Sequence, residues 1–454
     1  MLKFILGSIS FILFLCSSLV YASEVPFALL PLVSENYQLH SPQSSEGRLT
    51  MIYILQKDEL FRLDWNRFQT SPSIKFVLIS SSNINECSSE NTPFLEVLKV
   101  ENLNFDNIVN VVEKHSIRYN FDLKDSRFIS NDEYGIEIAG RLREYFQCYG
   151  AKPDDLLPFR NKHIAKDRLA SSGVSLPNFK AFKPSETQSS EVLNQLGLPI
   201  FVKPVDEARC KDVAKIATQE ELNSWWQEHE TRDSEFIAET YLDGSLYTGV
   251  GIVVSGELVA FGGHKFLHPC FNSMAQSLPL GGRSLHEEDE EYTKLLDSTR
   301  KTLLTLAKDD GVYHVEFIEH FGELMFIEAA ARTPGGYISD VISPGMGLHL
   351  AEVHFLLGMG QTWQPKSWQT ISKGKFAAWF WPPKGSGRVQ SLLEPNIKSF
   401  FHSFWRVQPG ETLTGPHYLG DSSVRLLLHN DRLEHLQEDL QYLEQSYQPI
   451  IWEP

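Results

Sequence analysis

The stretch from Tyr313 to Arg332, which reads YHVEFIEHFGELMFIEAAAR, is the most informative part of this sequence. Two apolar runs flank Phe321-Gly322-Glu323, and a short glycine-containing segment between such runs predicts a β-hairpin. With a three-residue loop, His320 pairs with Leu324 and the ladder continues back from the turn. The stretch therefore predicts two long antiparallel strands with a fixed register.

This register places Glu316 directly opposite Glu328. Opposed side chains have Cβ atoms about 4.5–5.5 Å apart, so the two carboxylates repel each other unless a cation lies between them. Magnesium prefers oxygen ligands and commonly takes one or two carboxylates together with substrate phosphates. We therefore predict that Glu316 and Glu328 bind Mg²⁺, with Mn²⁺ as an alternative. A two-residue loop would instead pair Glu316 with Ile327 and point the carboxylates to opposite faces.

Cationic residues follow from the same reasoning. Arg332 lies four residues beyond Glu328 and precedes the turn Thr333–Gly336. A guanidinium beside magnesium-bound phosphate stabilises charge on a transferring phosphoryl group, so Arg332 is the predicted catalytic residue. Lys203 ends an apolar strand, where its ammonium can reach nucleotide phosphates. The alternative is that these are ordinary charged residues that face solvent.

A further segment, Glu239-Thr240-Tyr241-Leu242, is typical of a hinge strand that holds adenine. Backbone groups of Tyr241 and Leu242 would contact the edge of the base, and Glu239 would accept from its amino group. The alternative is a plain edge strand.

Together these pieces resemble the ATP-grasp family and, within it, the L-amino acid ligases that make dipeptides. The matching segments occur in the family's order: Asn161-Lys162, Pro199–Pro204, Glu239–Gly244, Glu316, and Glu328–Arg332 with Gly335-Gly336. The resemblance implies that Lys162 and Lys203 contact ATP phosphates, that Glu239, Tyr241 and Leu242 hold the adenine, and that the metal and catalytic residues are those named above. It also implies ATP and Mg²⁺ as cofactors.

The implied activity is that of an ATP-dependent ligase that joins a small-molecule carboxylate to an amine, with amino acids as the expected substrates. Two alternatives stay open. One is a nucleotide-binding pseudoenzyme or secreted interaction protein, and the other is an ATP-grasp enzyme with a non-amine acceptor. Residues 205–213 contain no glycine where the family has a flexible phosphate loop, and this departure, together with the export signal described below, favours the first alternative. Residues 271–278 lack the Glu and His that some of the ligases carry, a departure that bears on the identity of the acid or amine substrate.

The rest of the chain predicts an α/β (α+β) protein in several domains. Strands at 51–55 and 74–79, helices at 105–115 and 133–149, and a possible strand at 118–121 predict an open sheet domain over residues 49–155. Residues 156–365 form the expected ATP-grasp domain with two subdomains. A helix is expected from Glu288 to Ala307, with Ser284 and Glu287 at the spacing of a capping box. Residues 366–454 are expected to form a small β-rich C-terminal domain.

The first residues resemble a targeting segment. Lys3 precedes an apolar stretch, and Ala22 offers a small residue for cleavage, which predicts a signal peptide over residues 1–22 and a linker over 23–48. The protein would then be exported, periplasmic or secreted. An uncleaved membrane anchor is the first alternative. A start near Met51, which would make the enzyme cytoplasmic, is the second.

Composition limits the partners. The chain has 454 residues, 42% hydrophobic and 22% charged, with a formal net charge of -17. An acidic chain without an excess of Lys and Arg is a poor candidate for nucleic-acid binding. Cys87, Cys148, Cys210 and Cys270 include no CxxC pair, so neither disulfides nor zinc ligation can be assigned. A homo-oligomer is compatible with the sequence.

Overall fold

The computed structural model describes residues 49–56, 63, 68, 72–81, 94–208, 210–361 and 376–454. The expected signal peptide and linker lie outside these ranges. Within the described part of the chain, no helix is both long and apolar enough to cross a membrane.

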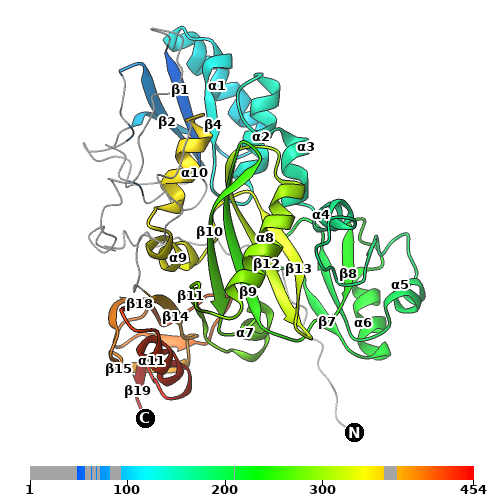
Figure 1. Ribbon diagram of the computed structural model, residues 1–454, viewed down its shortest axis with the longest axis vertical. Helices are drawn as coiled ribbons and strands as arrows, with labels where there is room; N and C mark the ends of the chain where they lie inside the picture. The colour runs from blue at the N-terminus through cyan, green and yellow to red at the C-terminus, as the bar shows by residue number, and fades with distance from the viewer. Residues whose placement is uncertain are drawn as a thin grey trace.

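The N-terminal region is a parallel sheet with helices on both faces (Figure 1). Its strands, in the spatial order β3-β2-β1-β4, are β1 (Thr50–Leu55), β2 (Ile74–Ser80), β3 (Phe94–Lys99) and β4 (Arg127–Ile129). Helices α1 (Phe105–Tyr119) and α2 (Gly135–Tyr145) pack on one face. The later helix α10 (Leu350–Gly358) covers the other face, where Phe355 packs against Phe76. Because both faces are covered, the central strands are almost wholly apolar.

The strand expected at 118–121 is wrong. Helix α1 continues to Tyr119, and Asn120 ends it with φ of 52°, in the left-handed region that Asn tolerates. The strand that completes the sheet is β4, after the short helix η4 (Leu123–Asp125).

An eight-stranded antiparallel sheet forms the body of the molecule (Figure 1). Its spatial order is β13-β12-β9-β10-β11-β14-β18-β16. The strands are β9 (Leu246–Val254), β10 (Glu257–Phe266), β11 (Leu280–Leu285), β12 (Gly311–His320), β13 (Glu323–Ala330), β14 (Phe376–Trp381), β16 (Phe400–Trp405) and β18 (Val424–Asn430). Helix α8 (Tyr292–Leu306) packs against β9 and β10, whereas α9 (Ile338–Met346) packs against β10, β11 and β14. This sheet carries the predicted metal residues at one edge, on β12 and β13.

The expected start of the helix near residue 288 needs correction. Helix α8 begins at Tyr292, and the acidic run before it forms turns. Ser284 lies in β11, where its hydroxyl donates to the carbonyl of Ala377, so it caps no helix. Strand pairing with β14 thus overrides the local capping pattern.

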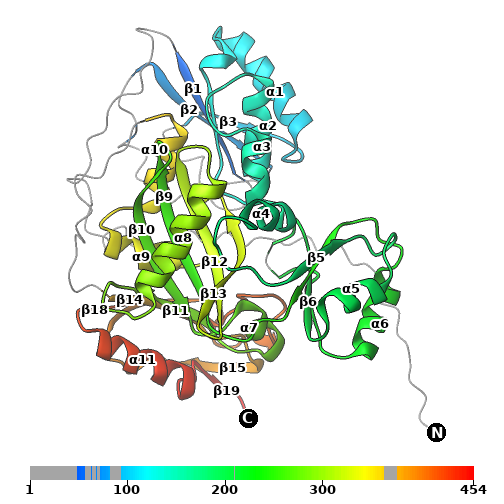
Figure 2. The ribbon, with the colours of Figure 1, turned by 45° about the vertical axis from the view of Figure 1, so that its right-hand side comes forward.

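A smaller antiparallel sheet lies to one side of the body (Figure 2). Its spatial order is β5-β8-β6-β7, with strands β5 (Phe179–Phe182), β6 (Ile200–Pro204), β7 (Ala214–Ile216) and β8 (Phe236–Thr240). Helices α5 (Ser189–Leu196) and α6 (Gln219–His229) complete a separate apolar core with it. The helices α3 (Pro153–Leu156), η5 (Leu157–Phe159) and α4 (Lys162–Leu169) connect the N-terminal region to this sheet. Strands β6 and β8 carry the predicted ATP residues Lys203 and Glu239.

The C-terminal region contributes to the eight-stranded sheet and also forms a small sheet of its own. Strand β14 pairs with β11, so the large sheet continues across the expected domain boundary at 365/366, which falls within residues that the structure does not describe. The small sheet has the order β17-β15-β19. Its strands are β15 (Ser386–Leu392), β17 (Thr412–Thr414) and β19 (Ile450–Trp452). Helix α11 (Leu433–Gln445) packs against β14 and β18, and helix α7 (Cys270–Gln276) lies between β10 and β11 in the chain.

Candidate active site

The hairpin of β12 and β13 brings Glu316 opposite Glu328, but its loop length and strand register differ from those predicted. His320 pairs with Glu323, so the loop has two residues, Phe321 and Gly322, whose φ angles are 49° and 82°. Two positive φ angles are typical of the tight turn that matches strand twist. The predicted three-residue loop is therefore wrong.

A β-bulge restores the predicted pairing. Phe317 pairs with Phe326, but the next pair is Glu316 with Glu328, so Ile327 is an extra residue on β13. Without it, a two-residue turn would place Ile327 opposite Glu316. The bulge moves Glu328 back into opposition, and the predicted juxtaposition of the two carboxylates is present.

The two carboxylates titrate as one interacting pair. Burial, and then the neighbouring Glu328, raise the pKa of Glu316 above its usual range. Burial alone would also raise the pKa of Glu328, but Lys162 and Lys203 together lower it below the usual range. Without a cation between the two groups, Glu316 is therefore the carboxylate that binds a proton more tightly.

Lys162 and Lys203 approach this pair from different elements. Lys162, in the first turn of α4, lies 3.3 Å from the Glu328 carboxylate and donates to the carbonyl of Glu207 at 2.6 Å. Lys203, on β6, forms an ion pair with Glu239 at 3.1 Å. Both ammonium groups are nearly buried, and their positive charges face the carboxylate pair.

Glu239 is buried and engaged by two lysines. Its Oε1 atom lies 3.1 Å from Lys203 and 3.0 Å from Lys166 of α4. Burial alone would raise the pKa of Glu239, but Lys166 and Lys203 lower it. Its side chain holds lysines in place, and the predicted contact with the adenine amino group stays a prediction.

Tyr241 and Leu242 directly follow β8, an inner strand of the small sheet, so the plain edge strand considered as an alternative is not what the structure shows. The Tyr241 N–H donates to the carbonyl of Pro199 at 3.0 Å, and Lys215 lies over the Tyr241 ring at 3.8 Å. Leu242 is buried. A contact to adenine would therefore use the Tyr241 carbonyl and the Leu242 N–H.

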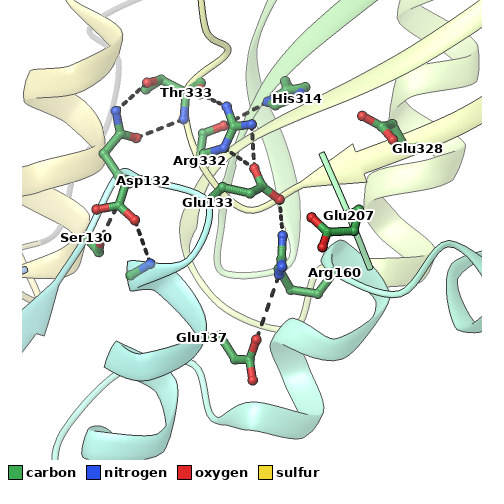
Figure 3. Close-up of polar contacts among 12 residues, drawn as sticks. Ser130, Asp132, Glu133, Glu137, Arg160, Glu207, His314, Glu328, Arg332 and Thr333 are labelled. Carbon is green, nitrogen blue, oxygen red and sulfur yellow. Dashed lines mark hydrogen bonds and ion pairs between the residues drawn. The ribbon is translucent and has the colours of Figure 1, made fainter. Parts of the chain in front are cut away.

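Arg332 is held by a residue from the N-terminal region. Its Nε donates to Glu133 at 2.6 Å, and its Nη1 donates to the carbonyl of Thr333 at 2.9 Å (Figure 3). Glu133 also accepts from Arg160, so one carboxylate holds two guanidinium groups. Although burial alone would raise the pKa of Glu133, Arg332 and Arg160 lower it. Asn131 and Thr333 exchange two hydrogen bonds beside this pair, which fixes the N-terminal region against the turn after Arg332.

Several of these side chains line one small pocket. Its lining includes Lys162, Glu328 and Arg332 of the predicted site, together with Glu133, Arg160 and Glu207. Glu316 lies beside it across the hairpin, whereas Tyr241 and Leu242, at the end of β8, do not line it. The structure therefore brings the predicted metal and catalytic residues together, with the hinge residues placed separately.

The residues present suit a magnesium–nucleotide group. Two opposed carboxylates supply oxygen ligands, and lysines beside them supply charge for phosphates. The hydroxyl of Thr248, directly across from Glu316 on β9, is buried and makes no hydrogen bond in the described part of the protein. No group of three or more His, Cys, Asp or Glu in the described ranges is arranged to hold a metal. Phosphate oxygens and water would therefore have to complete the coordination.

The glycine-free phosphate loop adopts a conformation that usually calls for glycine. Cys210 and Asp212 have φ angles of 55° and 53°, in the left-handed region that non-glycine residues adopt only at some cost. Lys211 forms an ion pair with Glu207 at 2.6 Å. Cys210 and Asp212 thus adopt a backbone conformation that glycine adopts more easily.

Sequence reasoning missed Lys166, Glu133 and Arg160. Lys166 lies four residues after Lys162 on α4, and a like-charge pair at this spacing is unfavourable unless acids compensate it. That spacing was a usable signal. Glu133 contacts Arg160 and Arg332 only through tertiary structure, and no local pattern marks these residues.

Comparison with known proteins gives a family match over part of the chain. Residues 169–266 match the family model described as "D-ala D-ala ligase C-terminus". The L-arginine-specific L-amino acid ligase of Bacillus subtilis is 26% identical over 231 residues, which cover 49% of this chain and 55% of that protein. The chain thus spans about half the length of this relative.

Solved structures match nearly the whole chain. The L-amino acid ligase from Bacillus licheniformis has a TM-score of 0.66 at 16% identity, over 90% of this chain and 99% of that one. The N5-carboxyaminoimidazole synthetase from Staphylococcus aureus, solved with ADP, has a TM-score of 0.62 at 15% identity, over 87% of this chain and 97% of that one. Identities this low establish the fold alone. Together with the family match over residues 169–266, they show that this chain has the ATP-grasp fold and resembles the L-amino acid ligases.

Proposed function

We propose that the protein is an ATP- and Mg²⁺-dependent carboxylate–amine ligase that forms an amide bond, with amino acids as substrates. The observation that carries this proposal is the opposition of Glu316 and Glu328 on one hairpin, beside Lys162 and Arg332. The activity of the sequence relative and the matching folds support it.

The chain's own residues suggest a two-step reaction. Lys162 and Lys203 bind the ATP phosphates, and Glu316 and Glu328 would hold Mg²⁺, which supplies charge neutralisation for the phosphates. A carboxylate oxygen of the first substrate attacks the γ-phosphorus, and the bond to ADP breaks. Arg332 offsets the charge that develops on the transferring phosphoryl group.

The second step completes the amide. The amine of the second substrate attacks the acyl carbon of the acyl phosphate, loses a proton, and phosphate leaves. Water must be kept out because it would hydrolyse the acyl phosphate. The network of Glu133, Arg160 and Arg332 closes one wall of the cavity against the N-terminal region.

The first experiment is phosphate release from ATP by protein that lacks residues 1–22, with a pool of amino acids. Release that depends on both Mg²⁺ and an amino acid, and that Glu328→Ala abolishes, is the expected result. If the protein showed no nucleotide binding and no phosphate release, the proposal would be overturned.

A nucleotide-binding protein without ligase activity is the second candidate. The observation that favours it is the glycine-free loop with left-handed Cys210 and Asp212, because such a loop closes over phosphates less freely. Magnesium-dependent ATP binding without phosphate release, over a broad range of acids and amines, would favour this candidate. An acceptor other than an amine would instead give release that needs an acid but no amine.

Export through residues 1–22 is a separate proposal. Cell fractionation with mass spectrometry of the N-terminus tests it, since cleavage predicts a chain that starts near Ser23. A chain that starts at Met51 in the cytoplasm would contradict it.

A further inference from the structure

Lys166 is a fully buried cation that the proposed reaction does not use. Its side chain is completely inaccessible to solvent, in the middle of α4. A buried ammonium needs partners for its charge and its three N–H donors. It has three: the carbonyl of Ile327 at 2.8 Å, the carboxylate of Glu239 at 3.0 Å, and the ring of Phe326 at 4.9 Å.

The carbonyl that Lys166 contacts belongs to the bulge residue. Ile327 is the extra residue of β13, and β13 is the edge strand of the large sheet. A bulge on an edge strand leaves backbone groups without a ladder partner. Lys166 supplies a charged donor to the Ile327 carbonyl. The Phe326 N–H donates to the backbone carbonyl of Ser175, which also lies outside the large sheet. The bulge is therefore fixed from outside the sheet.

The other end of the same contact lies in the small sheet. Glu239 of β8 binds Lys166 and Lys203 through one oxygen atom. Lys166 thus joins the strand that carries Glu328 to the carboxylate that holds the predicted phosphate-binding Lys203. The lysine one turn earlier, Lys162, contacts Glu328 itself. One face of α4 therefore touches both halves of the site.

We propose that Lys166 is a positioning residue that fixes the bulge at Ile327, keeps Glu328 opposite Glu316, and so pre-forms the divalent-metal site next to the nucleotide strand. The metal part of this inference rests on the proposed function, whereas the register part rests on the structure alone.

The first test measures metal affinity in place of turnover. Lys166→Met keeps the length of the side chain and removes its charge and donors, and Arg168→Met, on the exposed side of α4, is the matched control. Mg²⁺ binding is measured by calorimetry with a non-hydrolysable ATP analogue present, and the thermal midpoint is recorded for each variant. We expect the Mg²⁺ dissociation constant to rise about 10- to 100-fold in Lys166→Met, as for other residues that orient metal ligands, and to stay unchanged in Arg168→Met. An unchanged constant in a folded Lys166→Met protein would overturn the proposal.

A second measurement reads the register without metal or nucleotide. In Glu316→Cys/Glu328→Cys, directly opposed positions bring the two thiols within reach of a disulfide under a low-molecular-weight disulfide oxidant. Two thiols lose two protons and two electrons, and the oxidant takes them up. Mass spectrometry of the linked peptide gives the yield, and Glu316→Cys/Ile327→Cys reports the alternative register. We expect Lys166→Met to shift the yield from the first pair to the second. The same yields in both backgrounds would overturn the proposal.

Deletion of Ile327 tests whether Lys166 acts through the bulge. With the two-residue turn kept, the deletion moves Glu328 into the position opposite Glu316 with no bulge. In this background, Lys166→Met should change Mg²⁺ affinity less than about twofold, because there is no bulge left to hold. An equal loss in both backgrounds would show that Lys166 acts by another route and would overturn the proposal. If the deletion protein does not fold, the cysteine pairs decide.

The design separates this inference from the proposed function. A wild-type protein that binds no Mg²⁺ with nucleotide would remove the ligase proposal. The cysteine-pair yields would still decide whether Lys166 sets the register.

Discussion

Two glutamates in neighbouring sheets, Glu239 and Glu316, respond to burial in opposite ways. Each loses hydration, which alone would raise its pKa. Glu239 contacts two lysines of its own chain, and its pKa is lowered. Glu316 faces another carboxylate, and its pKa is raised. One site is electrostatically complete within the protein, and the other calls for a cation from outside.

The largest expected effect comes from removing the charge of Glu316 on the β12–β13 hairpin. Glu316→Gln should lower Mg²⁺-dependent phosphate release by about 100- to 1000-fold, because an amide cannot supply the charge that an electrostatically organised site provides. Phosphate release across a range of Mg²⁺ concentrations measures it. Glu323→Gln, at an exposed position of β13, is the control and should have no effect. Unchanged turnover in Glu316→Gln would place the metal elsewhere.

The next effect concerns stability on the Glu239 side. Glu239→Gln leaves two buried lysine charges without a counter-charge and should destabilise the protein by about 3 kcal/mol at neutral pH. Since the pKa of Glu239 is lowered by folding, its contribution is present above the unfolded pKa and is lost as pH falls through the folded one. Urea unfolding at several pH values measures this.

The matched control for Glu239 is Glu191→Gln. Glu191 forms an exposed ion pair with Lys180 at 3.9 Å, and such pairs contribute little. Equal losses in the two variants would mean that the two lysines do not depend on Glu239.

The third prediction is a gain in stability, where the previous one was a loss. In metal-free protein, Glu316→Gln should be more stable than the wild type at alkaline pH, by up to a few kcal/mol, since a change of one unit in pKa corresponds to about 1.4 kcal/mol. The pKa of Glu316 is raised by folding from 4.5 to about 8, so its contribution is fully present below 4.5 and is lost as pH rises to about 8. The advantage of the amide should therefore grow across this window and level off above it. An advantage that shrinks with rising pH would contradict the like-charge pair.

The smallest effect tests the turn that sets the register while both glutamates stay intact. Phe321 is 95% exposed and has a positive φ angle, which is costly for a bulky residue. Phe321→Asn creates the Asn-Gly pair that such turns favour and should raise stability by about 0.5 kcal/mol with no change in Mg²⁺ affinity. Calorimetric melting measures it. Phe321→Ala, which keeps the strained backbone, should not gain stability.

The hairpin shows how far the sequence predicts the site. Alternating apolar residues around Phe321-Gly322 located both strands, and the opposition of Glu316 and Glu328 was correct. The loop length was wrong, because a bulge depends on the partner that holds it. Lys166 is 161 positions away from Ile327, and no local sequence pattern around either residue predicts their contact.

The same limit appears elsewhere in the fold. Periodicity located β1, β2, α1 and α2, since each buries one regular apolar pattern. It misplaced a strand at 118–121, where the pattern of α1 continued to an Asn cap. It also assigned a capping role to Ser284, which belongs to a strand whose partner β14 comes over ninety residues later. The continuation of a local helix decided the first case, and long-range strand pairing decided the second.

The continuous eight-stranded sheet has a consequence for how such a protein can change over generations. Because β14 pairs with β11, a chain that ends before residue 376 would leave the backbone of β11 as an open edge in the middle of the molecule. Strands β14, β18 and β16 therefore cannot be exchanged independently of β11. Gene fusions or swaps with proteins of the same fold would have to replace both strands together, and natural variation in β11 and β14 should be correlated.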